Sequence, residues 1–218
     1  MGNKISRKES ERVRRRDAIL DAAEGLISDI GFDSTTMDQI AELAEVGKGT
    51  LYLHFESKSA IYLAICERGS RLLNERMAAV LAKDLSGLEM VEMLGNVYLQ
   101  FVQMNPQYFY AFKYYEGLMA EDKIRDTEIA EQCEENAKNA MTYIVRALQI
   151  GMQDGSIDDS YDPNQLGVMI YGASKGIINM AFLKKQGQHF KVLNNVDVSL
   201  DTMINGFIQL IGRGIAGK

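Results

Sequence analysis

The chain is poor in residues that break helices or cross-link small folds. Its 218 residues include only two prolines, Pro106 and Pro163, two cysteines and no tryptophan. Such scarce proline suits long helices and argues against a sandwich of many short strands. The two cysteines, Cys66 and Cys133, form no CxxC motif, so we expect reduced thiols rather than a disulfide framework or a redox site.

Long apolar segments are also missing. No uninterrupted apolar run approaches the ~18–20 residues of a membrane span. Residues 1–16 are polar and basic and lack the apolar core of a signal peptide. Hydrophobic residues make up 46% of the chain and charged residues 25%, which is ordinary for a globular protein. The sequence therefore predicts a cytoplasmic protein without a membrane partner.

The sequence contains no recognisable constellation for catalysis. Its two histidines, His54 and His189, are far apart and belong to no HExxH motif. A GxSxG motif, a phosphate-binding loop and a nucleotide fingerprint are likewise missing from the printed sequence. We therefore expect no enzyme, no cofactor and no metal site.

Positive charge is concentrated at the N-terminus of an acidic chain. The formal net charge is −6, but residues 1–16 carry +5 and the remaining residues −11. The seven basic residues of this arm are Lys4, Arg7, Lys8, Arg12, Arg14, Arg15 and Arg16. A basic segment of this kind can meet phosphates, while an acidic body resists non-specific association.

Apolar residues recur at helical spacing along the whole chain, and no segment alternates convincingly as a strand would. The predicted helices are residues 12–29, 36–44, 48–55, 58–82, 88–102, 106–119, 127–153, 163–186 and 199–213. The fold class is therefore all-α, with an N-terminal three-helix helix-turn-helix domain and a larger C-terminal helical domain.

The run from Thr35 to Phe55 predicts two short helices joined by a tight turn. Thr36 and Gln39 have the spacing of a capping box, and Gly47 is expected to supply a backbone conformation closed to other residues. One face should be buried, formed by Ile40, Ala41, Ala44, Val46, Leu51 and Phe55. The residues left to point outward are Lys48, Gly49, Thr50, Tyr52 and His54, as in a helix-turn-helix whose second helix enters the DNA major groove.

Residues from about 19 to 62 resemble the DNA-binding domain of the TetR family of bacterial transcription regulators. The resemblance rests on Thr-Met-Asp-Gln-Ile-Ala at 36–41 and on the continuous run from Val46 to Lys58. It implies a DNA-binding domain at residues 1–57 and an effector-binding and dimerisation domain at 58–218. The expected DNA contacts are Arg14, Arg15, Arg16, Thr35, Thr36, Lys48, Gly49, Thr50, Tyr52, His54 and Lys58.

Six aromatic residues crowd the segment from Tyr108 to Tyr115, too many for one buried face. Such a stripe is more often core, but the resemblance implies an effector pocket here, for a mainly apolar ligand. The expected pocket residues are Phe101, Met104, Tyr108, Phe109, Phe112, Tyr115, Met141, Tyr143, Met169 and Tyr171.

The last two predicted helices are apolar over broad faces, which predicts a homodimer interface. Its expected residues are Leu166, Met169, Ile170, Ala173, Ile177, Met203, Phe207, Ile208 and Ile211. The resulting hypothesis is a homodimeric repressor that a small ligand releases from a palindromic DNA operator. The alternatives are a helical ligand carrier or enzyme without DNA binding, and a TetR-like activator.

Overall fold

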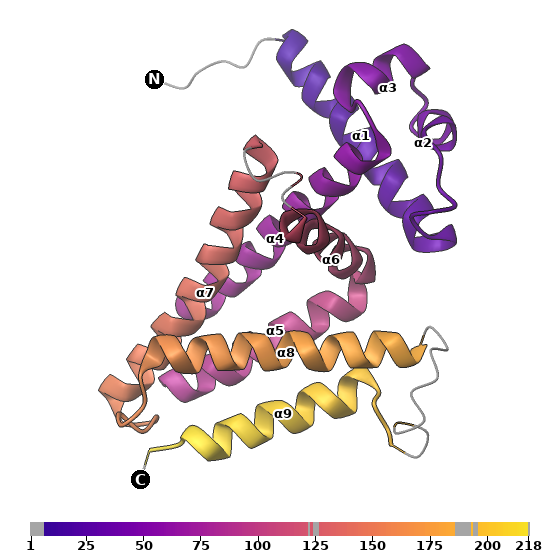
Figure 1. Cartoon of the computed structure of the whole chain (residues 1–218). Coiled ribbons are helices and arrows are strands. Elements are labelled where there is room, and N and C mark those ends of the chain that lie inside the picture. Colours follow the sequence, from indigo (N-terminus) through magenta and orange to yellow (C-terminus); the bar gives the residue numbers. More distant parts are fainter. Residues whose placement is uncertain (1–6, 122, 124–126, 186–192, 194–195, 218) are drawn as a thin grey trace. The chain divides into compact units, whose positions relative to one another are not determined.

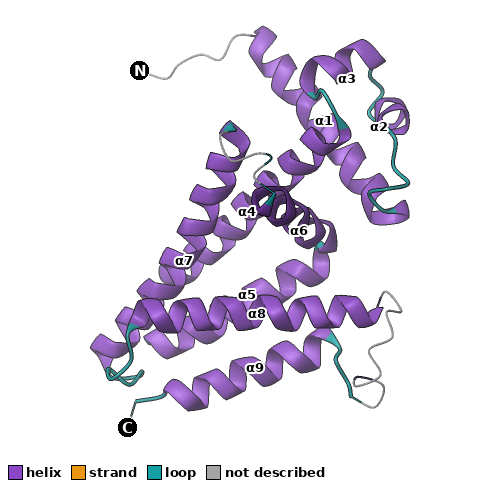
Figure 2. Cartoon of the chain, viewed as in Figure 1, coloured by secondary structure: helices purple, strands orange, loops and turns teal. Residues whose placement is uncertain are grey.

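The computed structural model describes residues 7–121, 123, 127–185, 193 and 196–217. Within these residues it confirms the all-α prediction, with nine α-helices and a single isolated bridge between Ile157 and Ala216 (Figures 1 and 2). The helices are α1 (Arg7–Ile30), α2 (Met37–Leu43), α3 (Lys48–His54), α4 (Lys58–Leu81), α5 (Gly87–Met104), α6 (Pro106–Ala120), α7 (Glu128–Asp154), α8 (Pro163–Lys185) and α9 (Leu200–Ile215).

The chain forms two compact units. The first unit comprises residues 1–69 and 105–133, and the second comprises residues 70–104 and 134–218. The division falls inside α4 and inside α7, and it groups α6 with α1, α2 and α3. The predicted domains, residues 1–57 and 58–218, are each continuous in sequence, and this division by function stays a prediction.

Helix α1 is longer than its apolar pattern predicts, because it begins at Arg7 rather than near residue 12. The described part of the basic arm is therefore helical, while Lys4 lies outside the described residues. The helix ends as expected at Gly31, whose φ of 82° suits glycine. Helix α1 packs against α2, and α2 packs against α3. Ile19, Leu20, Ile40, Leu51 and Ile61 are fully buried in this unit.

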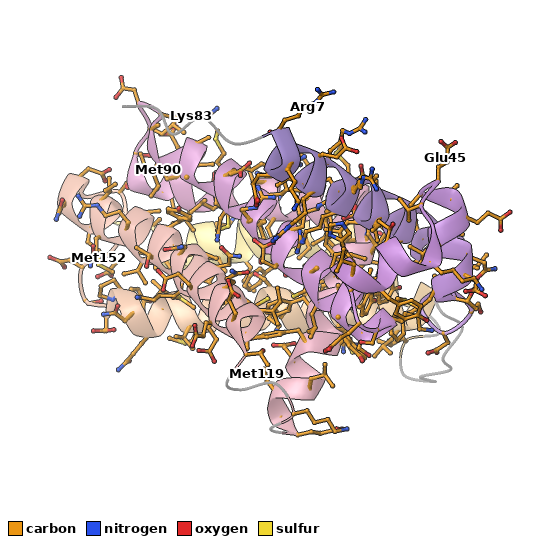
Figure 3. All side chains as sticks on the ribbon, turned by 90° about the horizontal axis from the view of Figure 1, so that it is seen from above. Arg7, Glu45, Lys83, Met90, Met119 and Met152 are labelled. Atoms are coloured by element: carbon orange, nitrogen blue, oxygen red, sulfur yellow. The ribbon has the colours of Figure 1, made fainter. Side chains whose placement is uncertain are left out.

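The turn between α2 and α3 corrects one prediction. Thr36 and Gln39 do form the reciprocal capping box. Gly47, however, has an ordinary extended conformation (φ −67°), and the left-handed residue is Glu45, with φ 53°. Glu45 donates its N–H to Glu42 and Val46 donates to Ala41, the paired bonds of a Schellman motif. The Glu45 side chain projects away from the ribbon (Figure 3), so nothing but backbone strain opposes this conformation.

The two cysteines lie closer than their separation in sequence suggests. Both are buried free thiols in the first unit, and Cys133 Sγ lies 3.9 Å from Cys66 Sγ. The hydrogen bond with Cys133 and the burial raise the pKa of the Cys66 thiol. Since the thiolate is the reactive form, this pair has the character of inert core cysteines.

In the second unit, the C-terminal part of α4 packs with α5, α7, α8 and α9. Its apolar core includes Met77, Leu94, Leu148, Leu166 and Ile215. Helices α8 and α9 lie side by side and run antiparallel (Figure 1), and α5 also packs against α9. At the start of α5, Gly87 is so close to the backbone of Gly151 in α7 that a Cβ at residue 87 would clash.

One helix among the described residues meets the length and hydropathy of a membrane span. Residues 163–184 of α8 have a mean hydropathy of 1.4, and only 22% of the apolar window is buried. One such helix is weak evidence for a membrane protein. The finding does identify an apolar helix face that the chain itself leaves largely uncovered.

Candidate functional site

Helix α3 exposes one face and buries the other. Leu51 is fully buried and Phe55, just beyond the helix, is nearly so, which anchors α3 in the core of the first unit. On the opposite side Lys48 and Gly49 are exposed, Tyr52 is 53% exposed and Leu53 is 83% exposed. Thr50 is half-buried. Leu53 is not among the predicted site residues. Because it directly follows Tyr52 on α3, the helical periodicity could have placed it near the same exposed face.

Lys48 has a partner within the fold. Its Nζ lies 2.7 Å from Asp38 Oδ2 of α2, and both side chains are mostly exposed. The hydrogen bond to Asp38 raises the pKa of Lys48, so the ammonium stays charged. An exposed pair of this kind contributes little stability and can be opened at small cost. Lys48 is thus available to an external anion.

Positive charge gathers around His54 at the end of α3. Burial lowers the pKa of His54, and the charges of Arg12, Arg16 and Arg15 lower it further. The Arg16 guanidinium lies 5.3 Å from the Phe55 ring centroid, which holds it beside the end of α3. These contacts make the N-terminal half of α1 and the end of α3 one electropositive surface.

Arg14 and Arg15 are partly neutralised by a carboxylate of their own helix. Arg14 lies 3.0 Å and Arg15 2.9 Å from the same Glu11 oxygen. The hydrogen bonds from both arginines lower the pKa of Glu11. Since all three side chains are substantially exposed, the pairs orient the arginines without burying them.

Three other residues predicted to contact DNA stabilise the turn between α1 and α2. Thr35 is buried and donates its hydroxyl to the Gly31 carbonyl at 2.8 Å. Thr36 caps α2. The Lys58 ammonium donates to the carbonyls of Phe32 and Thr35 at 2.7 and 3.0 Å, and it lies 4.4 Å from the Phe32 ring centroid. Thr35 and Lys58 therefore position the turn, and Thr36 is the exposed member of this group.

The second unit contains an apolar cavity of about 80 Å³. Its lining comes from α4, α5, α7, α8 and α9, and the residues are Leu73, Met77, Val91, Glu92, Leu94, Gly95, Tyr98, Ala140, Ile144, Ile170, Tyr171, Ser174, Ile204, Phe207, Ile208, Ile211 and Gly212. Of the predicted pocket residues it includes Tyr171. Four of its lining residues, Ile170, Phe207, Ile208 and Ile211, were predicted for the dimer interface instead.

The remaining predicted pocket residues fall into two groups. Tyr108, Phe109, Phe112 and Tyr115 belong to α6 in the first unit, where Tyr108 donates a 2.9 Å hydrogen bond to Glu24. Burial raises the pKa of Tyr108 beyond its ordinary range. The others belong to the second unit but do not line this cavity; they are Phe101, Met104, Met141, Tyr143 and Met169. Met104 and Met169 are mostly exposed.

An exposed stripe of small and apolar residues follows α8 and α9. On α8 it includes Val168, Met169, Gly172, Ala173 and Gly176, and on α9 it includes Gly206 and Leu210. We call these residues the α8–α9 face. Of the predicted interface, Met169 and Ala173 lie on this face and Leu166 is buried in the core. Ile177 and Met203 are half-buried. No group of three or more potential metal-ligating side chains occurs among the described residues.

Helices α1, α2 and α3 have the arrangement of a DNA-binding helix-turn-helix, in which the second short helix exposes one face. Residues 19–65 match the model of the bacterial regulatory proteins of the tetR family. This match confirms the predicted resemblance to the TetR family over the helix-turn-helix segment.

Curated relatives match a short segment of the chain. The negative transcriptional regulator IcaR of the biofilm operon icaADBC from Staphylococcus aureus (strain Newman) is 47% identical over 47 residues, 22% of this chain and 25% of that protein. The transcriptional activator FasR from Mycolicibacterium smegmatis is 42% identical over 67 residues, 31% of this chain and 28% of that protein. The matched segment thus spans about a quarter of these relatives' length.

Solved structures extend the likeness to nearly the whole chain. The regulator FadR from Bacillus subtilis, in complex with stearoyl-CoA, matches with a TM-score of 0.66 and 20% identity over 91% of this chain and 98% of that chain. A putative transcriptional regulator from Saccharomonospora viridis, in complex with choline, matches with a TM-score of 0.74 and 19% identity over 93% of this chain and 98% of that chain. At this identity the matches demonstrate a shared fold.

Proposed function

We propose that the chain is a DNA-binding transcription regulator, a homodimeric repressor that a small, mainly apolar ligand releases from a palindromic operator. The observation that carries this proposal is the exposed face of α3 beside the electropositive surface around His54. Neither ligand transport nor catalysis requires an exposed helix face beside an electropositive surface. We further propose a cytoplasmic location, which suits a protein that acts on DNA.

The contacts divide into two kinds. Lys48, Gly49, Thr50 and Tyr52 would meet base edges in the major groove, because they form the open side of α3. Arg14, Arg15, Arg16, Thr36 and His54 would hold phosphates and fix the register of the protein on the duplex. Thr35 and Lys58 would act indirectly, by holding the turn through the carbonyl contacts described above.

A second copy of the chain would cover the α8–α9 face. Glycine and alanine allow helix backbones to approach closely, and the exposed apolar residues beside them favour burial. The recognition helices of such a dimer would read half-sites about 34–36 Å apart, which requires a palindromic operator. In this division of labour, residues 1–57 bind DNA and residues 58–218 bind the effector and the partner.

The cavity of the second unit would hold the effector. Its walls are almost entirely apolar, and α8 and α9 contribute both to the cavity and to the α8–α9 face. A ligand that enlarges the cavity would therefore shift helices of the proposed dimer interface. It would favour a dimer with a different separation of recognition helices, which fits the operator poorly.

The test is a titration of DNA with variants of α3. Lys48→Ala and Tyr52→Ala should each weaken binding to a selected operator by roughly 5- to 150-fold, if each removes a base contact worth about 1–3 kcal/mol. Fluorescence anisotropy at fixed salt measures the dissociation constant, and thermal unfolding checks that the fold is kept.

Matched controls are available in the second unit. Lys138 forms an exposed ion pair with Glu135 as Lys48 does with Asp38, and Tyr161 is an exposed tyrosine comparable with Tyr52. Lys138→Ala and Tyr161→Ala should leave DNA affinity unchanged. Wild-type affinity in both α3 variants would disprove the assignment of α3 as the recognition helix.

An activator remains the second candidate, because one aligned relative, FasR, is described as a transcriptional activator. The two functions share the DNA contact and differ in the sign of the effect. A reporter gene placed behind the selected operator separates them, since deletion of a repressor raises expression and deletion of an activator lowers it.

A further inference from the structure

The polar side chains in the cavity wall carry one sign of charge. Among the residues that line it, Glu92 is the single carboxylate, and no lysine, arginine or histidine is present. Lys175 lies 5.3 Å from the ring centroid of Tyr171 but does not line the cavity. The wall of the cavity is thus apolar with one carboxylate.

The position of the Glu92 carboxylate depends on a glycine of the facing helix. A Cβ built at Gly212 of α9 would lie 2.5 Å from Glu92 Oε1. Gly212 is buried, so the missing side chain leaves room for the carboxylate between α5 and α9. Among the described residues no ion pair involves Glu92. A half-buried carboxylate without a countercharge is costly unless a partner compensates it.

The nearby hydroxyl of Ser174 is also set up to accept hydrogen bonds. Ser174 Oγ donates its proton to the Ile170 carbonyl at 2.7 Å, so only its lone pairs remain for a ligand. Tyr98 adds an aromatic ring, a group whose face attracts cations, whereas the Tyr171 ring already lies beside the Lys175 ammonium. Charge, hydrogen-bonding capacity and ring electrostatics therefore favour the same kind of ligand.

We propose that the cavity binds a small organic cation, an amine or ammonium group on a short apolar body, with Glu92 as its counterion. The proposal rests on the proposed effector site and names its ligand class. An anionic ligand would place two like charges in an apolar space without a basic residue to compensate them. The volume of about 80 Å³ is roughly half that of an engineered cavity that holds benzene, so the unexpanded site suits an apolar body of a few carbons.

The test compares three probes of nearly equal size, n-butylamine, n-butanol and butyrate. Calorimetric or NMR titration of the full chain without DNA, at pH 7.4 and constant ionic strength, gives the three affinities. We expect n-butylamine to bind at least about tenfold more tightly than butyrate, with n-butanol between them. Equal affinities, or a preference for butyrate, would overturn the proposal.

Two variants test the role of the carboxylate. Glu92→Gln removes the charge, and Gly212→Ala keeps the charge but displaces the carboxylate, because the new Cβ would occupy its place. Each should weaken n-butylamine at least about tenfold and leave n-butanol nearly unchanged. Glu75→Gln, which alters an exposed carboxylate paired with Arg71, serves as the control. Wild-type affinity for n-butylamine in both cavity variants would refute the counterion.

Failure of this proposal and failure of the proposed function can be told apart. The probe titrations need no operator, and the DNA titrations need no ligand. A protein that binds its operator but prefers butyrate would refute the cationic ligand alone. A protein that binds n-butylamine but no DNA would refute the regulator alone.

Discussion

Arg68 provides the sharpest test of how the first unit is held together. Its side chain is only 13% exposed, and its guanidinium lies 3.0 Å from Asp17, 2.5 Å from Asp21 and 3.2 Å from Glu24, all on α1. Tyr108 of α6 donates to the second Glu24 oxygen at 2.9 Å. One charged network thus links α4, α1 and α6. Replacing Arg68 by methionine keeps most of the apolar stem and removes every ionic contact.

The magnitude follows from the exposure of the three carboxylates. Asp17 and Asp21 are 51% and 69% exposed, so water can solvate both carboxylates when the arginine is removed. The loss of these two ion pairs therefore costs little. The Glu24 side chain is only 14% exposed and would keep Tyr108 as its remaining described hydrogen-bond partner. Breaking such a buried pair costs about 3 kcal/mol, the lower end of the usual range. For a chain of this length that lowers the unfolding midpoint by roughly 6–12 °C.

The loss should also depend on pH, because burial already raises the pKa of Glu24, opposed by Tyr108 and Arg68. Without Arg68 the folded-state pKa rises further above the unfolded value. A carboxyl group whose pKa is higher in the folded protein than in the unfolded chain stabilises the fold while it is protonated. That stabilisation is complete below the pKa of the unfolded chain and is lost as the pH rises through the pKa of the folded protein. The cost of Arg68→Met should therefore be larger at pH 8 than at pH 5.

Urea unfolding followed by far-ultraviolet circular dichroism at pH 5 and pH 8 measures both effects. Arg71→Met is the matched control, since Arg71 is on the same helix and pairs with Glu75 at 3.0 Å in an exposed position. The control should cost less than about 0.5 kcal/mol. If Arg68→Met costs no more than Arg71→Met, or if its cost is the same at both pH values, the role of the network is refuted.

Three further predictions concern the turn, the DNA surface and the dimer. Glu45→Gly should raise the free energy of unfolding by about 0.5 kcal/mol, because glycine tolerates the positive φ at this position. Gly47→Ser should raise it by a similar amount, because serine can cap α3 in the ordinary extended conformation found there. A loss of stability for Gly47→Ser would show instead that the turn requires glycine at residue 47. Burial lowers the pKa of His54, and the charges of Arg12, Arg16 and Arg15 lower it further. Bound phosphates offset those charges, so binding takes up a proton and operator affinity should rise as the pH falls from 8 to 5.5. His54→Gln should flatten that profile, which an anisotropy titration would reveal. Ala173→Arg should convert a dimer into a folded monomer by light scattering, whereas a dimer unchanged at micromolar concentration would place the interface elsewhere.

Local interactions explain which parts of the fold the sequence could predict. The capping box of Thr36 and Gln39 is formed within four residues, and Gly31 and Gly155 end their helices with the positive φ that glycine tolerates best. The same reasoning misplaced the strain of the turn after α2. Hydrogen bonds of a Schellman motif impose the left-handed conformation at Glu45, although glycine stands two positions later.

Long-range contacts explain what the sequence could not predict. The periodicity of α8 and α9 marks their apolar residues but does not say which of them face α5. Ile170, Phe207 and Ile208 line the cavity, whereas Met169 and Ala173 are exposed on the α8–α9 face. The aromatic run of α6 is similarly ambiguous. Tyr108 donates its hydrogen bond to Glu24, which lies 84 positions away in the chain. A local sequence pattern cannot predict such a contact.

Selection of DNA from the source genome shows directly whether the protein reads a palindromic operator through α3. Fragments retained by the wild-type protein and by Lys48→Ala, at salt that suppresses non-specific binding, would be sequenced and compared. The wild-type dimer should enrich a palindrome whose half-sites lie about one helical turn, or a multiple of it, apart, and Lys48→Ala should lose that enrichment. A wild-type protein that enriches no sequence, or a variant that enriches the same palindrome equally well, would contradict this prediction.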